Sequence, residues 1–316
     1  MMEKSSFRKA FGKTLVEVAT KNPNVVVLVA DVSSSVMTNY FAEKFPERFF
    51  NLGIQEAGMV DTAVGFALAG MIPFVNTFAG LFLRTMEQIR TCVAYAKTNV
   101  KLIGGYAGVS DFKDGPTHHS IIDIATMRAM PNLTVVAPAD AVEVKKLLPL
   151  VAEYDGPVYM RISRADTPVV FNDNHKVKIG KGVLVQDGND VTLIGSGVMV
   201  YRCLKAAKIL SKEGISCRVI NIHTIKPLDA SLIKESAEKT GAIVSVEEHS
   251  IIGGLGAAIA EALGNMYPVP LERVGIADTF AETALDFESL LDHYGMAVED
   301  IIKSAKRAFE RKKGKK

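Results

Sequence analysis

The sequence predicts an α/β protein with two doubly wound domains, each a mostly parallel sheet flanked by helices. Short apolar runs alternate along the chain with longer segments whose apolar residues recur at helical spacing. The alternation stops once, at a polar segment that contains Pro168 and has no clear period, and then starts again. We therefore expect a first domain at residues 1–165, a linker at 166–181 and a smaller second domain at 182–316.

The first domain is expected to open with a helix, because Phe11, Leu15 and Val18 recur at helical spacing. The run at 25–30 is apolar throughout, which is typical of a strand buried on both faces of a parallel sheet. Further strands are expected at 72–76, 99–104, 133–137 and 157–162, and helices at 56–69, 84–97, 121–129 and 141–154.

The second domain repeats this pattern. Strands are expected at 191–195, 217–222, 242–246 and 271–276, and helices at 198–213, 230–239, 254–264 and 297–310. The segment QDGND at 186–190 precedes a strand and is interpreted as a β-turn, not as a metal site. The segment GGLG at 253–256 opens a helix and could cradle a phosphate, but the alanine-rich helix after it favours close packing.

Composition excludes several classes of function. Of the 316 residues, 48% are hydrophobic, and the net charge is +2 with both signs mixed, so neither a nucleic-acid nor a membrane partner is indicated. The three cysteines are far apart, which indicates neither a disulfide framework nor a metal cluster. The first residues lack an apolar signal-peptide core, and no apolar run is long enough to span a membrane. A cytoplasmic protein is expected.

One carboxylate, Glu56, stands at the start of an otherwise apolar helix in the segment Asn51–Gly70. Small and aliphatic residues on this helix allow close packing on both sides, so Glu56 is expected to face a dry cleft, where it could donate a proton. The alternative is a solvent-exposed residue that favours the helix dipole.

Polar and aromatic residues follow the predicted strands. Asp31 follows the first strand, Phe78 follows the strand at 72–76, and a polar, glycine-rich loop at 104–120 follows the next. Arg164 follows the last strand of the first domain. Ligands of open parallel sheets bind at the carboxyl ends of the strands, so we expect these segments to form one site.

These features resemble a known family. The Glu56 helix, the phrase VNTF at 75–78 and the string DGPTHH at 114–119 are similar to the pyrimidine-binding domain of transketolases. Transketolases are thiamine-diphosphate enzymes that move two-carbon ketol units between sugar phosphates. The resemblance begins near Arg8 and reaches the last helix. In the second half it includes TIKPLD at 224–229, VEEH at 246–249 and GGLG at 253–256. The second domain thus resembles the transketolase C-terminal domain.

The resemblance implies a cofactor side of the site. A glutamate at the position of Glu56 bonds the N1′ nitrogen of the cofactor's aminopyrimidine and relays the proton that activates it, so Glu56 is expected to be catalytic. Phe78 matches an aromatic residue that stacks on the pyrimidine. Asp31 and Leu81 are expected to line the same pocket, although an aromatic residue is common where Leu81 stands.

The resemblance also implies residues for the two-carbon unit of the substrate. His118 matches a position that bonds the hydroxyl of this unit, and it is expected to be catalytic together with Glu56. Asp114 matches an aspartate near the substrate hydroxyls. The neighbouring His119 is interpreted as a solvated turn residue.

The far end of a sugar phosphate needs a cationic grip, and the planar guanidinium of arginine fits phosphate oxygens. Arg8, Ser35 and Arg164 match this role in the family. Tyr106 stands where many transketolases place a substrate-binding histidine. Because a tyrosine hydroxyl is neutral near pH 7, the preference for the donor sugar is left open at this point.

One family element has no counterpart in the sequence. Full-length transketolases begin with a pyrophosphate-binding domain, whose Gly-Asp-Gly motif and a following asparagine hold Mg²⁺ and the diphosphate. We expect these ligands on a separate N-terminal subunit, and no metal ligand on this chain. Because the family's sites lie between subunits, a heterotetramer with two copies of each chain is expected.

Three other readings are open. Deoxyxylulose-phosphate synthase shares the thiamine core and the DGPTHH string, but it is usually one long chain. The β subunit of 2-oxo acid dehydrogenases resembles the Glu56 helix, TIKPLD and EEH, but DGPTHH is not a mark of that family. A non-catalytic nucleotide-binding subunit is the least favoured, because two α/β domains alone do not explain Glu56, Phe78, Asp114 and His118 together.

Overall fold

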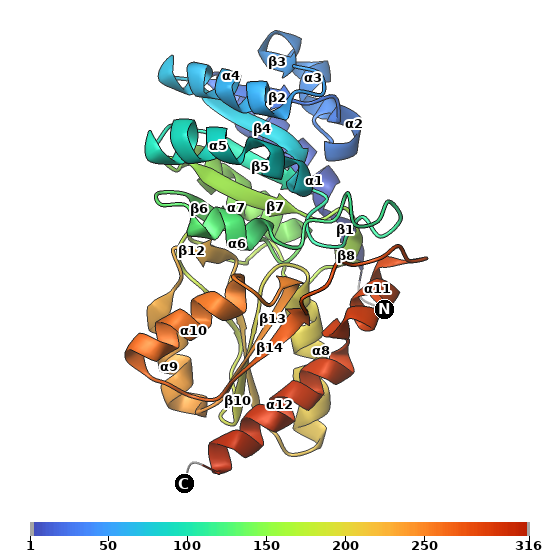
Figure 1. Ribbon diagram of the computed structural model, residues 1–316, viewed down its shortest axis with the longest axis vertical. Helices are drawn as coiled ribbons and strands as arrows, with labels where there is room; N and C mark the ends of the chain where they lie inside the picture. Colours follow the sequence, from blue (N-terminus) through green and yellow to red (C-terminus); the bar gives the residue numbers. More distant parts are fainter. Residues whose placement is uncertain (1–2, 315–316) are drawn as a thin grey trace.

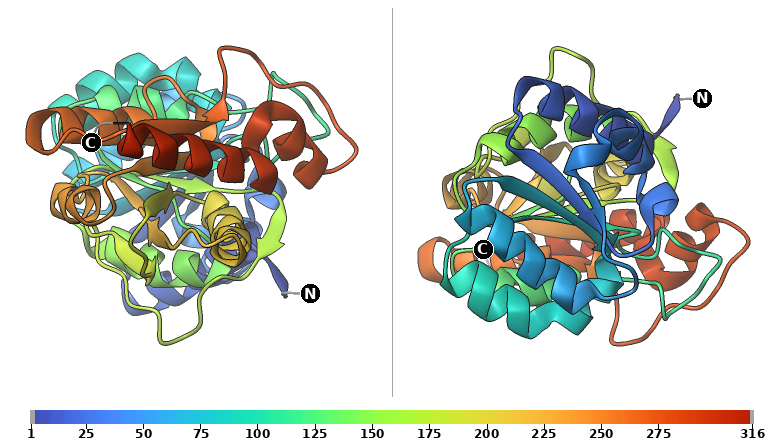
Figure 2. Two further views of the ribbon diagram at one scale, coloured as in Figure 1. Left: turned by 90° about the horizontal axis from the view of Figure 1, so that it is seen from below. Right: turned by 90° about the horizontal axis from the view of Figure 1, so that it is seen from above.

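The computed structural model describes residues 3–314, and the four terminal residues, which belong to the ends of the two expected domains, lie outside the described part. Two sheets lie one above the other along the long axis of the molecule, with helices on both faces of each (Figures 1 and 2). The upper sheet has seven strands and the lower sheet has five, and most neighbouring strands in both are parallel. The expected fold class is confirmed.

The strands of the seven-stranded sheet, in spatial order, are β12 (Thr224–Lys226), β6 (Thr134–Val136), β7 (Val158–Ile162), β5 (Lys101–Gly105), β4 (Ile72–Phe78), β2 (Val25–Val29) and β3 (Phe49–Asn51). The strands of the five-stranded sheet are β14 (Leu271–Ile276), β13 (Ile243–Ser250), β10 (Val191–Gly195), β11 (Cys217–Asn221) and β9 (Val183–Gln186). Two further strands, β1 (Lys4–Ser6) and β8 (Asp166–Pro168), form a separate antiparallel ribbon.

The helices beside the first sheet are α1 (Phe7–Lys21), α2 (Ser33–Val36), α3 (Asn39–Lys44), η1 (Pro46–Arg48), α4 (Glu56–Leu68), η2 (Ala79–Thr85), α5 (Met86–Gln88), η3 (Ile89–Tyr95), α6 (Asp123–Ala129) and α7 (Ala141–Glu153). Those of the second half are α8 (Met199–Lys212), α9 (Ala230–Thr240), α10 (Leu255–Met266), α11 (Phe287–Leu291), η4 (Asp292–Met296) and α12 (Val298–Lys313). The helix expected at 84–97 is therefore three joined segments that begin earlier, at Ala79.

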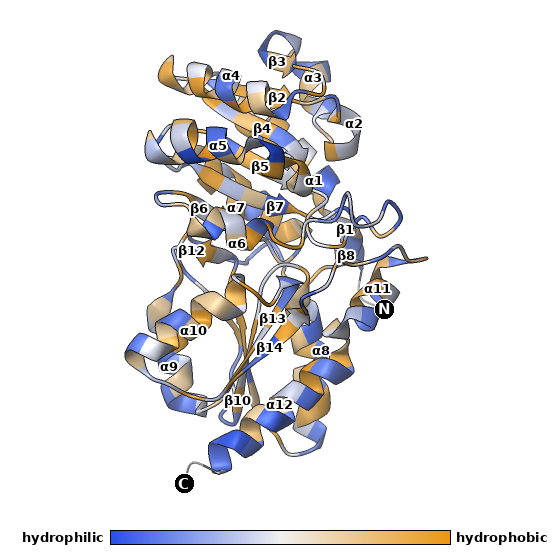
Figure 3. Cartoon of the chain, in the orientation of Figure 1, coloured by the Kyte–Doolittle hydropathy of each residue, from blue (hydrophilic) through white to orange (hydrophobic). Residues whose placement is uncertain are grey.

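The continuous apolar pattern of β2 reflects burial on both faces. Val25 and Val27 belong to one hydrophobic core, whereas Val26 and Leu28 belong to the other. Helices α1 and α7 pack on the first face, and α4 with η3 packs on the second (Figure 2). Orange segments accordingly fill the sheets in Figure 3, and blue residues lie on the outer faces of the helices.

The sequence analysis missed five short strands, β1, β3, β8, β9 and β12, which have three or four residues each. Such segments are too short to show a period. Two of them matter for the layout. β8 lies in the expected linker and pairs with β1, and β12 leaves the second half of the chain to pair with β6 of the first sheet.

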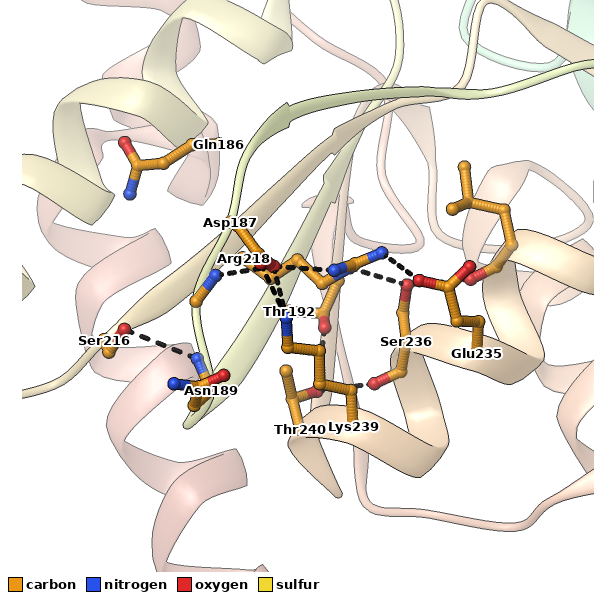
Figure 4. A network of polar contacts seen from close by, with 12 residues as sticks. Gln186, Asp187, Asn189, Thr192, Ser216, Arg218, Glu235, Ser236, Lys239 and Thr240 are labelled. Atoms are coloured by element: carbon orange, nitrogen blue, oxygen red, sulfur yellow. Dashed lines mark hydrogen bonds and ion pairs between the residues drawn. The ribbon is translucent and has the colours of Figure 1, made fainter.

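The QDGND segment connects β9 to β10, as expected for a turn. Its Asp187 carboxylate accepts hydrogen bonds from Lys239 Nζ at 2.6 and 2.7 Å and from Arg218 Nη1 at 2.6 Å (Figure 4). These cations, with Lys239 contributing most, lower the pKa of Asp187 to about 2. The carboxylate is thus bound by side-chain cations. Within residues 3–314, no helix is both long and apolar enough to cross a membrane.

Candidate active site

The predicted site residues lie at one edge of the seven-stranded sheet. The neighbouring parallel strands β3, β2, β4, β5 and β7 all end at this edge. In that order, the residues that end or follow these strands are Glu56, Asp31, Phe78, Tyr106 and Arg164. The convergence expected from strand order alone is therefore present.

Glu56 is the first residue of α4 and is only 5% exposed. Its burial excludes the alternative of a solvent-facing residue. The Oε1 atom of Glu56 accepts a hydrogen bond from Arg84 Nη1 at 3.0 Å, and Arg84 itself is largely exposed in η2. The sequence analysis missed this cation, because 28 residues separate the pair and no spacing connects them. The ion pair compensates the burial of the carboxylate from one side.

An aromatic pair lies at the centre of the edge. The rings of Phe78 and Tyr106 stack with centroids 4.1 Å apart and planes inclined by 23°. The ring of His118 lies 6.0 Å from that of Phe78. Leu81 packs against the same small cluster, which also contains Val36. Tyr106 has φ +57°, a conformation in which a bulky residue is strained, and this places its ring over Phe78.

Two predicted arginines lie beside Tyr106. Arg8 Nη1 donates to the Tyr106 hydroxyl at 3.3 Å and to the backbone carbonyl of Ser35 at 2.9 Å. The guanidinium carbons of Arg8 and Arg164 are each 5.4 Å from the centroid of the Tyr106 ring, within range of a cation–π interaction. The sequence reasoning thus located two cations that meet around one aromatic ring. Ser35 contacts Arg8 through its backbone, not through its hydroxyl.

Asp111 is a fully buried carboxylate that the sequence analysis missed. Its Oδ1 lies 3.2 Å from Arg164 Nε, and burial, reinforced by the nearby Asp114 carboxylate, raises the pKa of Asp111 to about 6. The only available signal was a second aspartate in the glycine-rich loop, three residues before Asp114.

The DGPTHH string is largely accessible. Asp114 is exposed, and His118 is half-buried with its Nδ1 3.0 Å from Thr117 Oγ1. The expectation for His119 was wrong, because this residue is 8% exposed and its Nε2 lies 3.0 Å from the Asp111 carbonyl oxygen. Burial lowers the pKa of His119, which favours the neutral ring. This ring holds the loop through its contact with the Asp111 carbonyl.

The second half of the chain holds this loop in place. The amide of Ala284 donates to the carbonyl of Phe112 at 2.8 Å, and Glu248 Oε1 accepts from the amide of Val109 at 2.8 Å. Figure 1 shows the loop of residues 106–120, in teal and green, beside the orange-red segment that precedes α11. The EEH phrase therefore has a structural role at the site.

Behind Glu248 lies a buried polar network. Arg161 Nε donates to Asp123 Oδ2 at 2.7 Å, and Tyr159 donates to the same oxygen at 2.7 Å. Arg161 Nη2 also donates to the carbonyl of Glu248 at 3.2 Å. Burial raises the pKa of Glu248 to about 8. This network joins the two halves of the chain beneath the site.

Asp31 occupies the outer part of the edge. It is exposed, has φ +56°, and is bound by Asn51, whose Nδ2 donates to Asp31 Oδ1 at 3.1 Å. Asn51 Oδ1 in turn accepts from the Asp31 amide at 3.0 Å. The Asp31 side chain contacts none of the other predicted residues in the hydrogen bonds and ion pairs of residues 3–314.

The side chains present suit one half of thiamine diphosphate. An aminopyrimidine needs a carboxyl partner for a ring nitrogen and apolar groups against its faces, and Glu56, Phe78 and Leu81 are of these types on adjoining elements. Among residues 3–314, no three His, Cys, Asp or Glu side chains lie close enough to hold a metal ion. A diphosphate-bound Mg²⁺ therefore finds no cluster of such ligands in the described part of this chain.

Comparison with known proteins agrees with this geometry. Residues 3–169 match the family model "Transketolase, pyrimidine binding domain", and residues 180–301 match "Transketolase, C-terminal domain". The chain belongs to the transketolase family. Within that family it corresponds to the C-terminal section of split transketolases.

Three similar proteins illustrate this. A protein of Methanocaldococcus jannaschii, provisionally named a transketolase C-terminal section, is 43% identical over 97% of this chain and 96% of its own length. A 6-deoxy-6-sulfo-D-fructose transketolase subunit of a Clostridium species is 38% identical over 98% and 97%. The solved structure of a split-gene transketolase, described as an inactive β4 tetramer, has a TM-score of 0.90 at 42% identity and covers 98% of this chain and 100% of that one.

Proposed function

We propose that this chain is the subunit of a thiamine-diphosphate-dependent transketolase that supplies the pyrimidine side of the cofactor site and the grip on an anionic sugar. The observation that carries the proposal is the meeting of Arg8 and Arg164 around Tyr106, at the edge where Glu56 is also buried. A proton-relay carboxyl and an anion site at the same sheet edge suit a sugar phosphate that reacts at one end and is held at the other.

In this proposal the cofactor supplies the nucleophilic carbon and the electron sink for transfer of a two-carbon ketol unit from a ketose to an aldose. Glu56 holds the proton at the pyrimidine N1′ nitrogen. Phe78 and Leu81 orient the pyrimidine ring, with Asp31 at the rim. His118 and Asp114 bind hydroxyls of the sugar, and Arg8, Ser35 and Arg164 hold its terminal phosphate.

A separate N-terminal subunit would carry the diphosphate site and its Mg²⁺. The relatives named as subunits support a two-chain enzyme, and the related β4 tetramer described as inactive agrees with a chain that needs a partner. A heterotetramer with two copies of each chain, in the cytoplasm, is the assembly that we propose.

The proposal specifies the chemical class of the substrate, a sugar with an anionic group, but not the particular sugar. The subunits named for 6-deoxy-6-sulfo-D-fructose and for apulose 4-phosphate act on sugars with a terminal sulfonate or phosphate, and both anions suit a pair of arginines. A second candidate is the synthesis of deoxyxylulose phosphate, because such synthases are 37% identical to this chain, which spans 48% of their length.

The test combines this chain with its partner, thiamine diphosphate and Mg²⁺. Ribose 5-phosphate with xylulose 5-phosphate tests ketol transfer, and pyruvate with glyceraldehyde 3-phosphate tests the synthase. We expect turnover of the first pair. Turnover of the second pair alone would replace the proposal with the synthase, and binding of nucleotides with no turnover of either would favour a non-catalytic subunit.

A further inference from the structure

Asp111 is an unusual group within the site. Its side chain is 0% exposed, and neither of its carboxylate oxygens accepts a hydrogen bond from a side chain or amide in residues 3–314. Arg164 Nε, at 3.2 Å from Oδ1, gives the carboxylate a charge partner without a well-aligned hydrogen bond. A buried carboxylate without hydrogen bonds is costly, so its place beside the proposed anion site calls for a role in that site.

The charged groups that face Asp111 come from two segments. Arg164 follows β7, and Asp114 and His118 belong to the same loop as Asp111. Burial and Asp114 raise the pKa of Asp111 to about 6, against the opposing effects of Arg164 and His118. Asp111 therefore exchanges its proton in the range of pH in which enzymes work.

Arg164, in contrast to Asp111, is partly exposed to solvent. Its side chain is 27% exposed, and its guanidinium lies over the rings of Tyr106 at 5.4 Å and Phe112 at 5.8 Å. Arg164 is therefore partly accessible to an anion from solvent, whereas Asp111 is fully buried. One cation then has two negative partners.

We propose that Asp111 is a positioning residue that shares Arg164 with the terminal anion of the substrate and takes up a proton from solvent when that anion binds. The inference rests on the proposed function, in which Arg164 grips the anion. In the free site, the ionised carboxylate is the partner of Arg164. An incoming anion repels that carboxylate, and its protonation removes the repulsion without breaking any bond of the substrate.

The sign of the effect on affinity follows from this exchange. Below about pH 6, Asp111 in the free site is already protonated, so affinity is constant. As the pH rises through this value, binding must take a proton from the buffer, and affinity falls. Asp111→Asn has no proton to gain. At about pH 8 its KM for an anionic acceptor should be ~10-fold lower than that of wild type, with equal values at about pH 5.5.

The experiment uses the reconstituted complex and a sugar sulfonate as the probe, because a sulfonate does not titrate in this range and a phosphate does. Calorimetric titration in two buffers of different ionisation enthalpy counts the protons taken up on binding. We expect uptake with wild type at about pH 7 and none with Asp111→Asn. Asp166→Asn, which changes an exposed carboxylate two residues after Arg164, should retain the uptake.

Each other outcome is decisive. Sulfonate binding by wild type without proton uptake overturns the inference, needs no variant, and leaves the proposed function standing. Uptake that persists in Asp111→Asn assigns the proton to a group other than Asp111 and also overturns the inference. Glycolaldehyde carries no anionic group. If Asp111→Asn also had a lower KM than wild type for glycolaldehyde, the substitution would affect the site in general, which would contradict a role of Asp111 beside Arg164. Absence of all ketol transfer by the complex, in contrast, overturns the proposed function itself.

Discussion

The rings of Phe78 and Tyr106 lie face to face, with centroids 4.1 Å apart, at the ends of neighbouring strands. In the proposed function Phe78 contacts the cofactor, and Tyr106 receives a hydrogen bond from the proposed phosphate ligand Arg8. The two ends of the site therefore share one aromatic stack. Changes to the anion grip can be separated from changes to the cofactor only by comparing substrates with and without a phosphate.

Tyr106→Phe keeps this stack and removes one hydroxyl. The lost hydrogen bond from Arg8 is long, at 3.3 Å, and a bond to a charged group contributes about 1.5–3 kcal/mol at best. We expect KM for ribose 5-phosphate to rise only a few-fold. Steady-state kinetics of the reconstituted enzyme measure this, and a loss of more than about 100-fold would show that the hydroxyl has a further role.

Arg164→Ala removes a full charge from the anion grip. KM for ribose 5-phosphate should rise more than ~10-fold, whereas glycolaldehyde, which has no phosphate, should be used almost as well as by wild type. If Arg164→Ala lowered kcat/KM equally for both acceptors, Arg164 would stabilise the loop through its ion pair with Asp111 and would not bind the phosphate.

Glu56→Gln keeps the size of the side chain and the oxygen that Arg84 contacts, but it has no carboxyl proton. If Glu56 relays a proton to the pyrimidine, exchange of the cofactor's C2 proton should slow by ~10⁴-fold, at the upper end of general acid–base effects. Hydrogen–deuterium exchange in the reconstituted variant measures this step directly. A rate equal to that of wild type would remove Glu56 from the relay.

The isolated chain should be inactive and bind thiamine diphosphate weakly, because the proposed function places the ligands of the diphosphate and of Mg²⁺ on the partner subunit. Activity should appear in proportion to added partner until the two chains are equimolar. Native mass spectrometry of the active fraction should show two copies of each chain. Ketol transfer by a preparation with no second polypeptide would contradict the split-enzyme proposal.

The buried Glu248 should make stability depend on pH. Burial raises its pKa to about 8 from 4.5, so the native state retains a proton that the unfolded chain releases between these values. Its contribution to stability is complete below about pH 4.5 and is lost as the pH rises through 8, by at most about 1.4 kcal/mol per pH unit.

Glu248→Gln keeps the oxygen that accepts from the Val109 amide and does not ionise. The free energy of unfolding of this variant, from urea titrations at about pH 5, 7 and 8.5, should fall less with pH than that of wild type. Parallel curves for the two proteins would show that Glu248 is ionised in the native state.

Much of the fold could be predicted because the longer elements repeat a strong local signal. The β2 run is apolar at every position since each side chain enters one of two cores, and the helical spacing of Phe11 and Leu15 reflects one buried face of α1. β12 could not be found in this way, because three residues carry no period and their partner, β6, is 88 positions away at Thr224 and Val136.

The site residues, like the strands, fall into those that a local sequence signal predicts and those that depend on contacts between distant segments. Glu56, Phe78, Tyr106 and Arg164 follow strands, so strand order alone places them at one edge. Arg84 and Asp111 were missed because their importance lies in contacts across 28 and 53 residues, with Glu56 and Arg164 respectively. His119 was misjudged for a similar reason. A histidine in a polar loop looks exposed until another part of the same loop covers it.

The antiparallel pairing of β12 with β6 bears on how this enzyme can be taken apart. A gene cut at residues 166–181 would give an N-terminal fragment whose β6 edge has lost its neighbour, with unpaired amides and carbonyls that can recruit another chain. Fragment complementation and domain chimaeras would therefore fail at that boundary unless residues 224–226 accompany the first sheet. A strand from the second half of the chain thus completes the sheet of the first half, so a cut between the two halves also divides one sheet.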